Sequence, residues 1–159
     1  MKKGIEKTNV MRTLEQKKIK YESHCYADTD AISGIEVVEA LSQNPNQVFK
    51  TLVTEAPSKN HYVFLVPVHK ELDLKKAARL AGEKSLEMVP VKDILQVSGY
   101  IRGGCTPVGM KKLFPTFFHE SCLDFETIFV SGGKPGTQIE ARPTDLITVS
   151  HGKTADIVC

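Results

Sequence analysis

Two strand-like segments joined by a very short loop constrain the fold of this chain more than any other feature. QVFKTLVTE (residues 47–55) and HYVFLVPV (61–68) are rich in β-branched and aromatic residues, and only APSKN (56–60) separates them. Two runs of this kind joined by five turn-forming residues predict a β-hairpin. The chain therefore contains at least one antiparallel strand pair, which excludes an all-helical fold.

Helix-start signals stand between the strand-like segments. Thr8 or Asn9 can cap a first helix that ends near residues 17–18, and Ser33 and Glu36 have capping-box spacing ahead of a second. Asp73 precedes a third helical pattern, LKKAARLA, which a glycine ends. Further short helices are expected over 91–99 and 143–150.

The order of the elements indicates the fold class. Besides the hairpin, strands are expected over 19–26, 87–90, 113–121, 126–131, 137–141 and 155–158. Most are joined by hairpins or short helices, without regular βαβ alternation, so we expect an α+β fold with a mixed, mostly antiparallel sheet. No repeat or linker divides the chain, and 159 residues suit one domain, 1–159.

Composition excludes several protein classes. With 41% hydrophobic and 25% charged residues, and no apolar run approaching the ~20 residues that cross a bilayer, we expect no membrane segment. MKKGIEKTNV lacks the apolar stretch of a secretory signal, which favours a cytoplasmic protein. Four scattered cysteines, without CxxC spacing, favour neither a metal site nor a disulfide framework.

The charge pattern argues against binding of long double-stranded nucleic acid, but it is compatible with local contact with phosphates. The net charge is only +2. Basic residues gather at 75–84 and at 102–112, and two such clusters could follow a short length of phosphate backbone. Solvated helix and loop faces explain the same clusters equally well.

A glycine-rich stretch, YIRGGCTPVGMKK (100–112), is the best candidate for a binding loop. Gly104 and Gly109 have the spacing of a phosphate-binding loop, but Met110 and Lys111 stand where that motif needs lysine and a hydroxyl. The second glycine motif, SGGKPGT (131–137), fails the same test because proline follows its lysine. The sequence therefore does not predict a nucleotide-binding loop.

No protein nucleophile or metal site is evident from the sequence. None of the five histidines lies beside a glycine motif, and neither GxSxG nor HExxH occurs. What remains is a site built from the main chain, in which Gly103 and Gly104 present amide groups to developing negative charge. The alternative is a structural bulge or turn before Pro107.

Lys50 is the second candidate. Within VFKTLV it shares a strand face with Val48 and Leu52, in a run that otherwise favours burial. Because lysine is almost never buried without a partner, its ammonium should lie at the edge of a cleft and face an anionic ligand. A lysine that extends from an edge strand into solvent is the alternative.

Four motifs together resemble one known family. TNVMRTLEQKKIKYESHCY, VFKTLV, GYIRGGCTPVGMKK and FETIFVSGGKPGTQIEARPTDL are similar in order and spacing to the YbaK/EbsC family of free-standing aminoacyl-tRNA editing domains. The likeness is specifically to its YbaK-type branch, which deacylates Cys-tRNA(Pro). The resemblance implies a β-barrel-like sheet flanked by helices, no cofactor or metal, the aminoacylated 3′ end of tRNA as substrate, and prolyl-tRNA synthetase as a candidate partner.

The resemblance also assigns roles to residues. Lys50 would hold the carboxyl-end oxygens or the 3′-terminal nucleotide, and Gly103 and Gly104 would bind the ester carbonyl. Cys105 stands where the family varies and is therefore not expected to be a nucleophile. The implied substrate-binding residues are Tyr26, Thr51, Cys105, Thr106, Ser131, Gly132 and Gly133.

The implied chemistry agrees with the missing nucleophile. A cysteinyl ester brings its own thiol, whose thiolate can attack the carbonyl and expel the tRNA. Two alternatives stay open at this point. One is water-mediated deacylation of another mischarged tRNA such as Ala-tRNA(Pro), and the other is a module that binds tRNA or a synthetase without catalysis.

Overall fold

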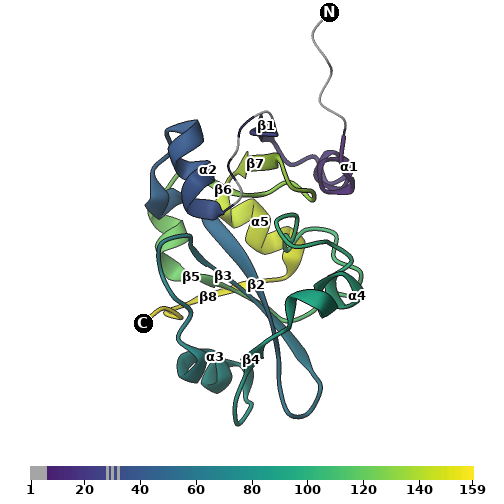
Figure 1. Ribbon diagram of the computed structural model, residues 1–159, viewed down its shortest axis with the longest axis vertical. Helices are drawn as coiled ribbons and strands as arrows, with labels where there is room; N and C mark the ends of the chain where they lie inside the picture. Colours follow the sequence, from purple (N-terminus) through teal and green to yellow (C-terminus); the bar gives the residue numbers. More distant parts are fainter. Residues whose placement is uncertain (1–6, 28, 30, 32) are drawn as a thin grey trace, which may run out of the picture.

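The computed structural model describes residues 7–27, 29, 31 and 33–159 (Figure 1). Its helices are α1 (Asn9–Gln16), α2 (Gly34–Leu41), α3 (Leu74–Ala81), α4 (Ile94–Ser98) and α5 (Pro143–Ser150), with 3-10 turns η1 (Pro45–Gln47), η2 (Val91–Asp93) and η3 (Glu120–Asp124). Its strands are β1 (Tyr21–Cys25), β2 (Phe49–Glu55), β3 (His61–Pro67), β4 (Glu87–Met88), β5 (Thr116–His119), β6 (Ile128–Ser131), β7 (Thr137–Ala141) and β8 (Lys153–Ala155). None of the described helices is long and apolar enough to cross a membrane.

Local sequence signals set the helix ends as expected. The Thr8 side chain accepts a hydrogen bond from the Met11 amide and caps α1, and Ser33 and Glu36 form a complete capping box on α2. Asp73 accepts hydrogen bonds from two first-turn amides of α3. α1 ends at Gln16, slightly before the expected boundary.

The strands form two sheets. β1, β7 and β6 make a three-stranded antiparallel sheet, and the five-stranded sheet has the order β4-β2-β3-β5-β8. In the second sheet β2 pairs antiparallel with β3 and β4, whereas β3–β5 and β5–β8 are parallel. The α+β class and the predicted hairpin are confirmed.

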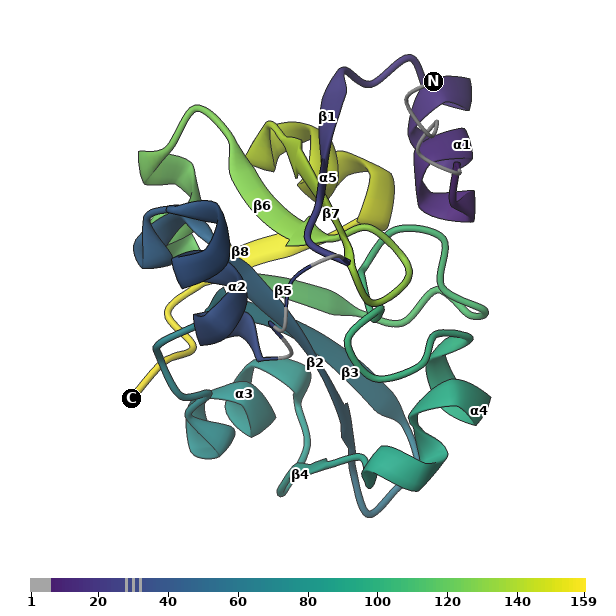
Figure 2. The same ribbon diagram turned by 45° about the horizontal axis from the view of Figure 1, so that its top comes forward.

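The expected single barrel-like sheet is replaced by two sheets that meet at one point. Val48, at the start of β2, makes an isolated parallel bridge to Phe129 of β6. Beyond this bridge the described strands form no further ladder between β2 and β6, so these strands close no barrel. Val38 of α2 packs beside the bridge, and Figures 1 and 2 show α2 in front of these strands.

The last strand also differs from expectation. β8 covers Lys153–Ala155 rather than 155–158. The reason is that the final residues pair elsewhere: the Asp73 amide donates to the Ile157 carbonyl at 2.8 Å, and the Cys159 amide donates to the Glu71 carbonyl at 3.1 Å. The end of the chain is thereby attached to the segment that leads into α3.

Side-chain alternation along β3 gives the five-stranded sheet two apolar faces. Val63 and Leu65 point into a core shared with α1, α5 and the three-stranded sheet, whereas Phe64 and Val66 point into a second core beneath α3. Each fully buried side chain of this size contributes about 1.5–3 kcal/mol relative to exposure. β2 is therefore held from both faces, which fixes the strand that borders the site.

Candidate functional site

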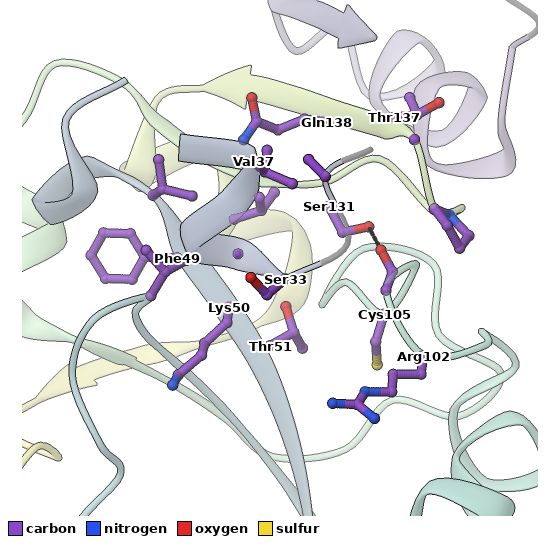
Figure 3. Close-up of a pocket in the computed structure, with 18 of the residues that line it drawn as sticks. Ser33, Val37, Phe49, Lys50, Thr51, Arg102, Cys105, Ser131, Thr137 and Gln138 are labelled. Atoms are coloured by element: carbon purple, nitrogen blue, oxygen red, sulfur yellow. Dashed lines mark hydrogen bonds between the residues drawn. The ribbon is translucent and has the colours of Figure 1, made fainter. Parts of the chain in front are cut away.

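The main pocket lies where β2 and β6 separate after the Val48–Phe129 bridge. It has a volume of about 1000 Å³, at the upper end of the range for small-molecule sites. Its walls come from β2, from the β6–β7 hairpin, from the start of α2 and from the loop around Gly103 (Figure 3). The expected site residues that line it directly are Tyr26, Lys50, Thr51, Gly103, Cys105 and Ser131.

The pocket wall at β2 is an unpaired strand edge. The Val68 amide donates to the Val48 carbonyl at 2.9 Å, so every second residue from Val48 onward pairs with β3. The main-chain groups of Thr51 and Val53 consequently face the other edge. There the Val89 amide donates to the Val53 carbonyl at 3.0 Å, whereas Thr51 has no ladder partner among the described residues. The amide and carbonyl of Thr51 are therefore available to a ligand.

The Thr51 side chain adds a third polar group at this edge. Its Oγ1 is buried and has no hydrogen-bond partner within the described part of the chain. A buried hydroxyl without a partner costs about 1–3 kcal/mol, which a bound ligand could recover. Thr51 was implied as a companion of Lys50, but the structure gives it the more complete set of polar groups.

The two adjacent glycines, Gly103 and Gly104, have different positions and hydrogen bonds. Gly103 is exposed, lines the pocket and adopts φ +88°, and its carbonyl accepts a hydrogen bond from Ser131 Oγ at 3.0 Å. Gly104 is buried behind the wall, and its amide donates to the Ile101 carbonyl at 2.9 Å. The expectation that both amides face the ligand is therefore corrected, because the Gly104 amide closes a turn instead.

Gly104 has a packing role. A Cβ at this position would lie 2.8 Å from Lys134 Cα and 3.0 Å from Lys134 N, closer than real Cβ contacts allow. Only glycine lets the loop around Gly103 approach the β6–β7 turn this closely. The pairing of these two loops, which the Ser131–Gly103 hydrogen bond also supports, sets the position of the Gly103 amide.

Three further expected site residues lie outside the pocket lining. Gly132 donates its amide to the Thr137 carbonyl at 2.8 Å, which closes the β6–β7 turn, and Gly133 packs against the start of α1 with φ +102°. Thr106 is fully buried, and its Oγ1 has no partner within the described residues. In the structure these three residues support the wall from behind, and their contact with substrate stays a prediction.

Two cationic side chains stand among the described residues of the pocket lining, Lys50 and Arg102. Lys50 pairs across the ladder with Val66, so its side chain leaves the opposite face of the sheet from that of Thr51. Figure 3 shows its ammonium directed away from Cys105 and Arg102. The guanidinium of Arg102 lies closer to Cys105, and the sequence had indicated Arg102 only as part of a basic cluster.

Cys105 is not activated as a nucleophile. Burial raises the pKa of its thiol to about 11, and hydrogen bonds from Ser98 and from the Thr106 amide offset this only in part. The thiol is therefore protonated near neutral pH. This agrees with the expectation that Cys105 is not a nucleophile.

Two pocket residues could not be anticipated from the sequence. Gln138 of β7 is buried and forms a reciprocal amide pair with Gln43, at 2.6 and 3.0 Å. This pair attaches the end of α2 to the three-stranded sheet. Ser33 also lines the pocket while it caps α2, so the start of that helix forms part of the wall.

The pocket lining is poor in groups that transfer protons. Among the described residues that line it there is no histidine, aspartate or glutamate. No cluster of three or more potential metal ligands occurs within the described ranges either. What the described lining offers is main-chain polar groups, hydroxyls and two cations, which can bind and orient an anionic or ester-containing ligand.

Comparison with known proteins agrees with this arrangement. The aminoacyl-tRNA editing domain family matches residues 29–149, which include β2, the Gly103 loop and the β6–β7 hairpin. The chain belongs to the aminoacyl-tRNA editing domain family. The YbaK/EbsC resemblance inferred from the four motifs is thereby confirmed.

Individual proteins and structures extend the likeness over almost the whole chain. A protein of Enterococcus faecalis named "Putative Cys-tRNA(Pro)/Cys-tRNA(Cys) deacylase EbsC" is 43% identical over 157 residues, which is 98% of this chain and 96% of that protein. A crystal structure described as "a putative trans-editing enzyme for prolyl tRNA synthetase" is 27% identical, with a TM-score of 0.81 and 94% of each chain covered. The structure of hypothetical protein APE2540 shares the fold, with a TM-score of 0.87 at 18% identity, covering 96% of this chain and all of that one.

Proposed function

We propose that this protein is a trans-acting aminoacyl-tRNA deacylase that cleaves the ester of Cys-tRNA(Pro) and Cys-tRNA(Cys). The pocket lining carries the proposal: it presents main-chain groups and cations, and no histidine or carboxylate among its described residues. Such a lining can hold an aminoacyl ester but supplies no evident nucleophile. The activity named for the 43% identical relative supports the same assignment.

In the proposed reaction the substrate supplies the nucleophile. A cysteinyl thiol with a pKa of about 8.5 is a few per cent thiolate at neutral pH. The thiol gives its proton to solvent, and the sulfur attacks the ester carbonyl carbon and forms a C–S bond. The C–O bond to the ribose then breaks, and the ribose oxygen takes a proton from solvent. Water subsequently opens the cyclic thioester to free cysteine.

The residues of the pocket act on this reaction by position and charge. The Gly103 amide stabilises the oxyanion, a contribution that is typically worth roughly 10²–10³-fold in rate. The Thr51 edge orients the aminoacyl group, since holding thiolate and carbonyl at near-attack distance supplies much of the rate. Because Lys50 points away from the Gly103 loop, we assign it to the ribose and phosphate of the terminal nucleotide.

The size of the pocket favours selection by chemistry. A cavity of about 1000 Å³ is too large to distinguish cysteine from amino acids of similar volume by steric fit. A methylene discriminates by only ~10–200-fold even in a fitted pocket. A reaction that needs the substrate's sulfur excludes other amino acids whatever their size. Seryl-tRNA, which has the same shape and a poorer nucleophile, is therefore expected to react at least about a hundredfold more slowly.

The decisive experiment incubates the purified protein with Cys-tRNA(Pro), Cys-tRNA(Cys), Ala-tRNA(Pro), Pro-tRNA(Pro) and Ser-tRNA, and follows loss of the acyl group. We expect rapid loss from both cysteinyl substrates alone. Rapid deacylation of Ala-tRNA(Pro) or Ser-tRNA would exclude the substrate-thiol mechanism in favour of activated water. No deacylation of any substrate would leave a binding module as the function.

Lys50→Ala separates catalysis from binding. We expect this variant to keep its affinity for tRNA within a few fold and to lose about a hundredfold in deacylation rate, because the terminal nucleotide is no longer held in register. Lys153→Ala, which removes an exposed lysine on β8, is the matched control. Equal loss of affinity and rate in Lys50→Ala would refute this role. Prolyl-tRNA synthetase is the proposed partner. The proposed location is the cytoplasm, because aminoacylated tRNA is made and used there.

A further inference from the structure

The rim of the pocket formed by β4, η2 and α4 carries an unusual concentration of exposed apolar side chains. Nine large apolar side chains are exposed among the described residues, and four of them lie within 88–101. Two of the four, Met88 and Val91, also line the pocket, so the surface continues from its interior to the outside. We call the set of four the α4 rim, and it consists of Met88, Val91, Leu95 and Ile101, each 44–56% exposed.

Two residues of the α4 rim lie on one helical face. η2 runs directly into α4, so Val91 and Leu95 lie one turn apart on the same side. The Gly99 amide caps this helix by donating to the Leu95 carbonyl at 2.9 Å. Ile101 follows the cap and directly precedes Arg102, whose side chain belongs to the pocket.

Basic residues also border the α4 rim. Lys92 is exposed between its apolar residues, Arg102 borders it, and the Lys111 amide donates to the Ser98 carbonyl at the end of α4. Two acidic residues, Glu87 and Asp93, lie on the same segment, and Glu87 points to the opposite face of β4 from Met88. The rim formed by α2, GIEVVEAL, has two glutamates and no basic residue.

We propose that the α4 rim binds the unpaired nucleotides that precede the aminoacylated end of tRNA, an inference that rests on the proposed function. These nucleotides are covalently continuous with the group in the pocket and must leave through its mouth. Each brings an apolar base face and one phosphate, which match an apolar surface bordered by Lys92 and Arg102. The α2 rim exposes one large apolar side chain among its described residues, Ile35, and has no basic residue to meet a phosphate.

Comparing two substrates separates the contribution of this contact from that of the pocket itself. Cys-tRNA(Pro) carries the unpaired nucleotides, whereas cysteinyl-adenosine ester carries only the terminal nucleoside. Wild-type protein is expected to favour the tRNA, and Leu95→Asp is expected to lower the ratio of the two kcat/KM values about tenfold, mainly through KM for the tRNA. Lys92→Glu should also weaken the salt dependence of the tRNA reaction, since one phosphate contact contributes roughly 0.7 to its logarithmic slope.

The chain offers matched controls for Leu95→Asp. Leu80 of α3 and Leu123 of η3 are exposed to a similar degree, 41% and 51%, and lie outside the pocket and the α4 rim. Leu80→Asp and Leu123→Asp should leave the ratio unchanged, and melting curves confirm that all three variants fold. The same loss in all three would overturn the proposal as a nonspecific charge effect.

The remaining outcomes are distinct. An unchanged ratio in Leu95→Asp, with both substrates cleaved, overturns the proposal while the proposed function stands. If Leu95→Asp acts normally on free tRNA but no longer binds a synthetase, the α4 rim is a protein-docking surface and the proposal is overturned. If wild-type protein cleaves neither substrate, the proposed function fails, and this inference fails with it.

Discussion

Replacing Gly104 with alanine tests whether close packing of two loops positions the site. The added Cβ would lie 2.8 Å from Lys134 Cα, whereas ordinary contact begins at 3.4 Å, so the loops must separate by about 0.6 Å, the difference between these two distances. The atoms in the way are main-chain atoms, which cannot turn aside as a flexible side chain can. Overpacking of this kind costs about 1–3 kcal/mol.

The expected effect appears in two measurements. For a domain of this size a loss of about 1 kcal/mol shifts the melting temperature by about 2–4 °C, so Gly104→Ala should melt roughly 2–12 °C below wild type. The same displacement moves the neighbouring Gly103 amide. Because a misplacement of about 1 Å can cost about a hundredfold in rate, kcat for Cys-tRNA(Pro) deacylation should fall between about tenfold and a hundredfold.

Gly82→Ala is the control, because it separates lost stability from lost position. Gly82 caps α3 with φ +74°, and nothing lies within 4 Å of the point that an added Cβ would occupy. Its left-handed conformation alone should cost about 1–2 kcal/mol, without change in kcat. A Gly104→Ala protein with wild-type melting temperature and kcat would refute the packing argument, as would an equal loss of kcat in Gly82→Ala.

Three further predictions concern stability and pH. Alkylation of Cys105 by iodoacetamide should be much slower in the folded protein at neutral pH than after unfolding, because burial raises the thiol pKa to about 11. The alkylation rate should rise as the pH approaches this pKa. Rapid labelling at neutral pH would contradict this prediction. Replacing either Gln43 or Gln138 with alanine should destabilise the protein by about 1–3 kcal/mol in urea unfolding, because the partner amide is left unpaired, and the double variant should cost less than the sum. Asp156→Asn should melt lower than wild type at neutral pH. The hydrogen bond that Lys76 donates lowers the carboxyl pKa of Asp156 below its ordinary value of 3.8, so this stability is present above pH 3.8 and is lost as the pH falls through the folded-state pKa, below which the two proteins should melt alike. A difference that persists at low pH would argue against the ion pair as its source.

Much of the fold follows from signals that are local in the sequence. The β2–β3 hairpin and the caps of α1, α2 and α3 depend on residues within a few positions of one another, and all were predicted. The meeting of the two sheets could not be predicted in this way. It depends on Val48 and Phe129, which are far apart in the chain and ordinary in type.

In the site, too, features with a local sequence signal were predicted, and features that depend on distant residues were not. Lys50 and the glycine pair were predicted as site residues because lysine in an apolar strand and adjacent glycines are unusual in themselves, and Lys50 and Gly103 line the pocket. Which glycine faces the pocket was not predictable, because the Gly104 amide is used in a turn with Ile101 that the sequence permits but does not require. The Gln43–Gln138 pair joins residues 95 positions apart and leaves no local signal.

The edge of β2 beside Thr51 has no neighbouring strand among the described residues, because β4 pairs with β2 only at Thr54 and Glu55, and in the proposed function the substrate occupies this space. Since the groups on that edge belong to the peptide unit, exchanging the side chain leaves them in place, and only proline would abolish the donor. These main-chain groups therefore stay in place as long as the backbone conformation is kept, even when the side chain at this position changes. A short extended peptide could supply the absent strand, which makes such peptides a rational starting point for inhibitors.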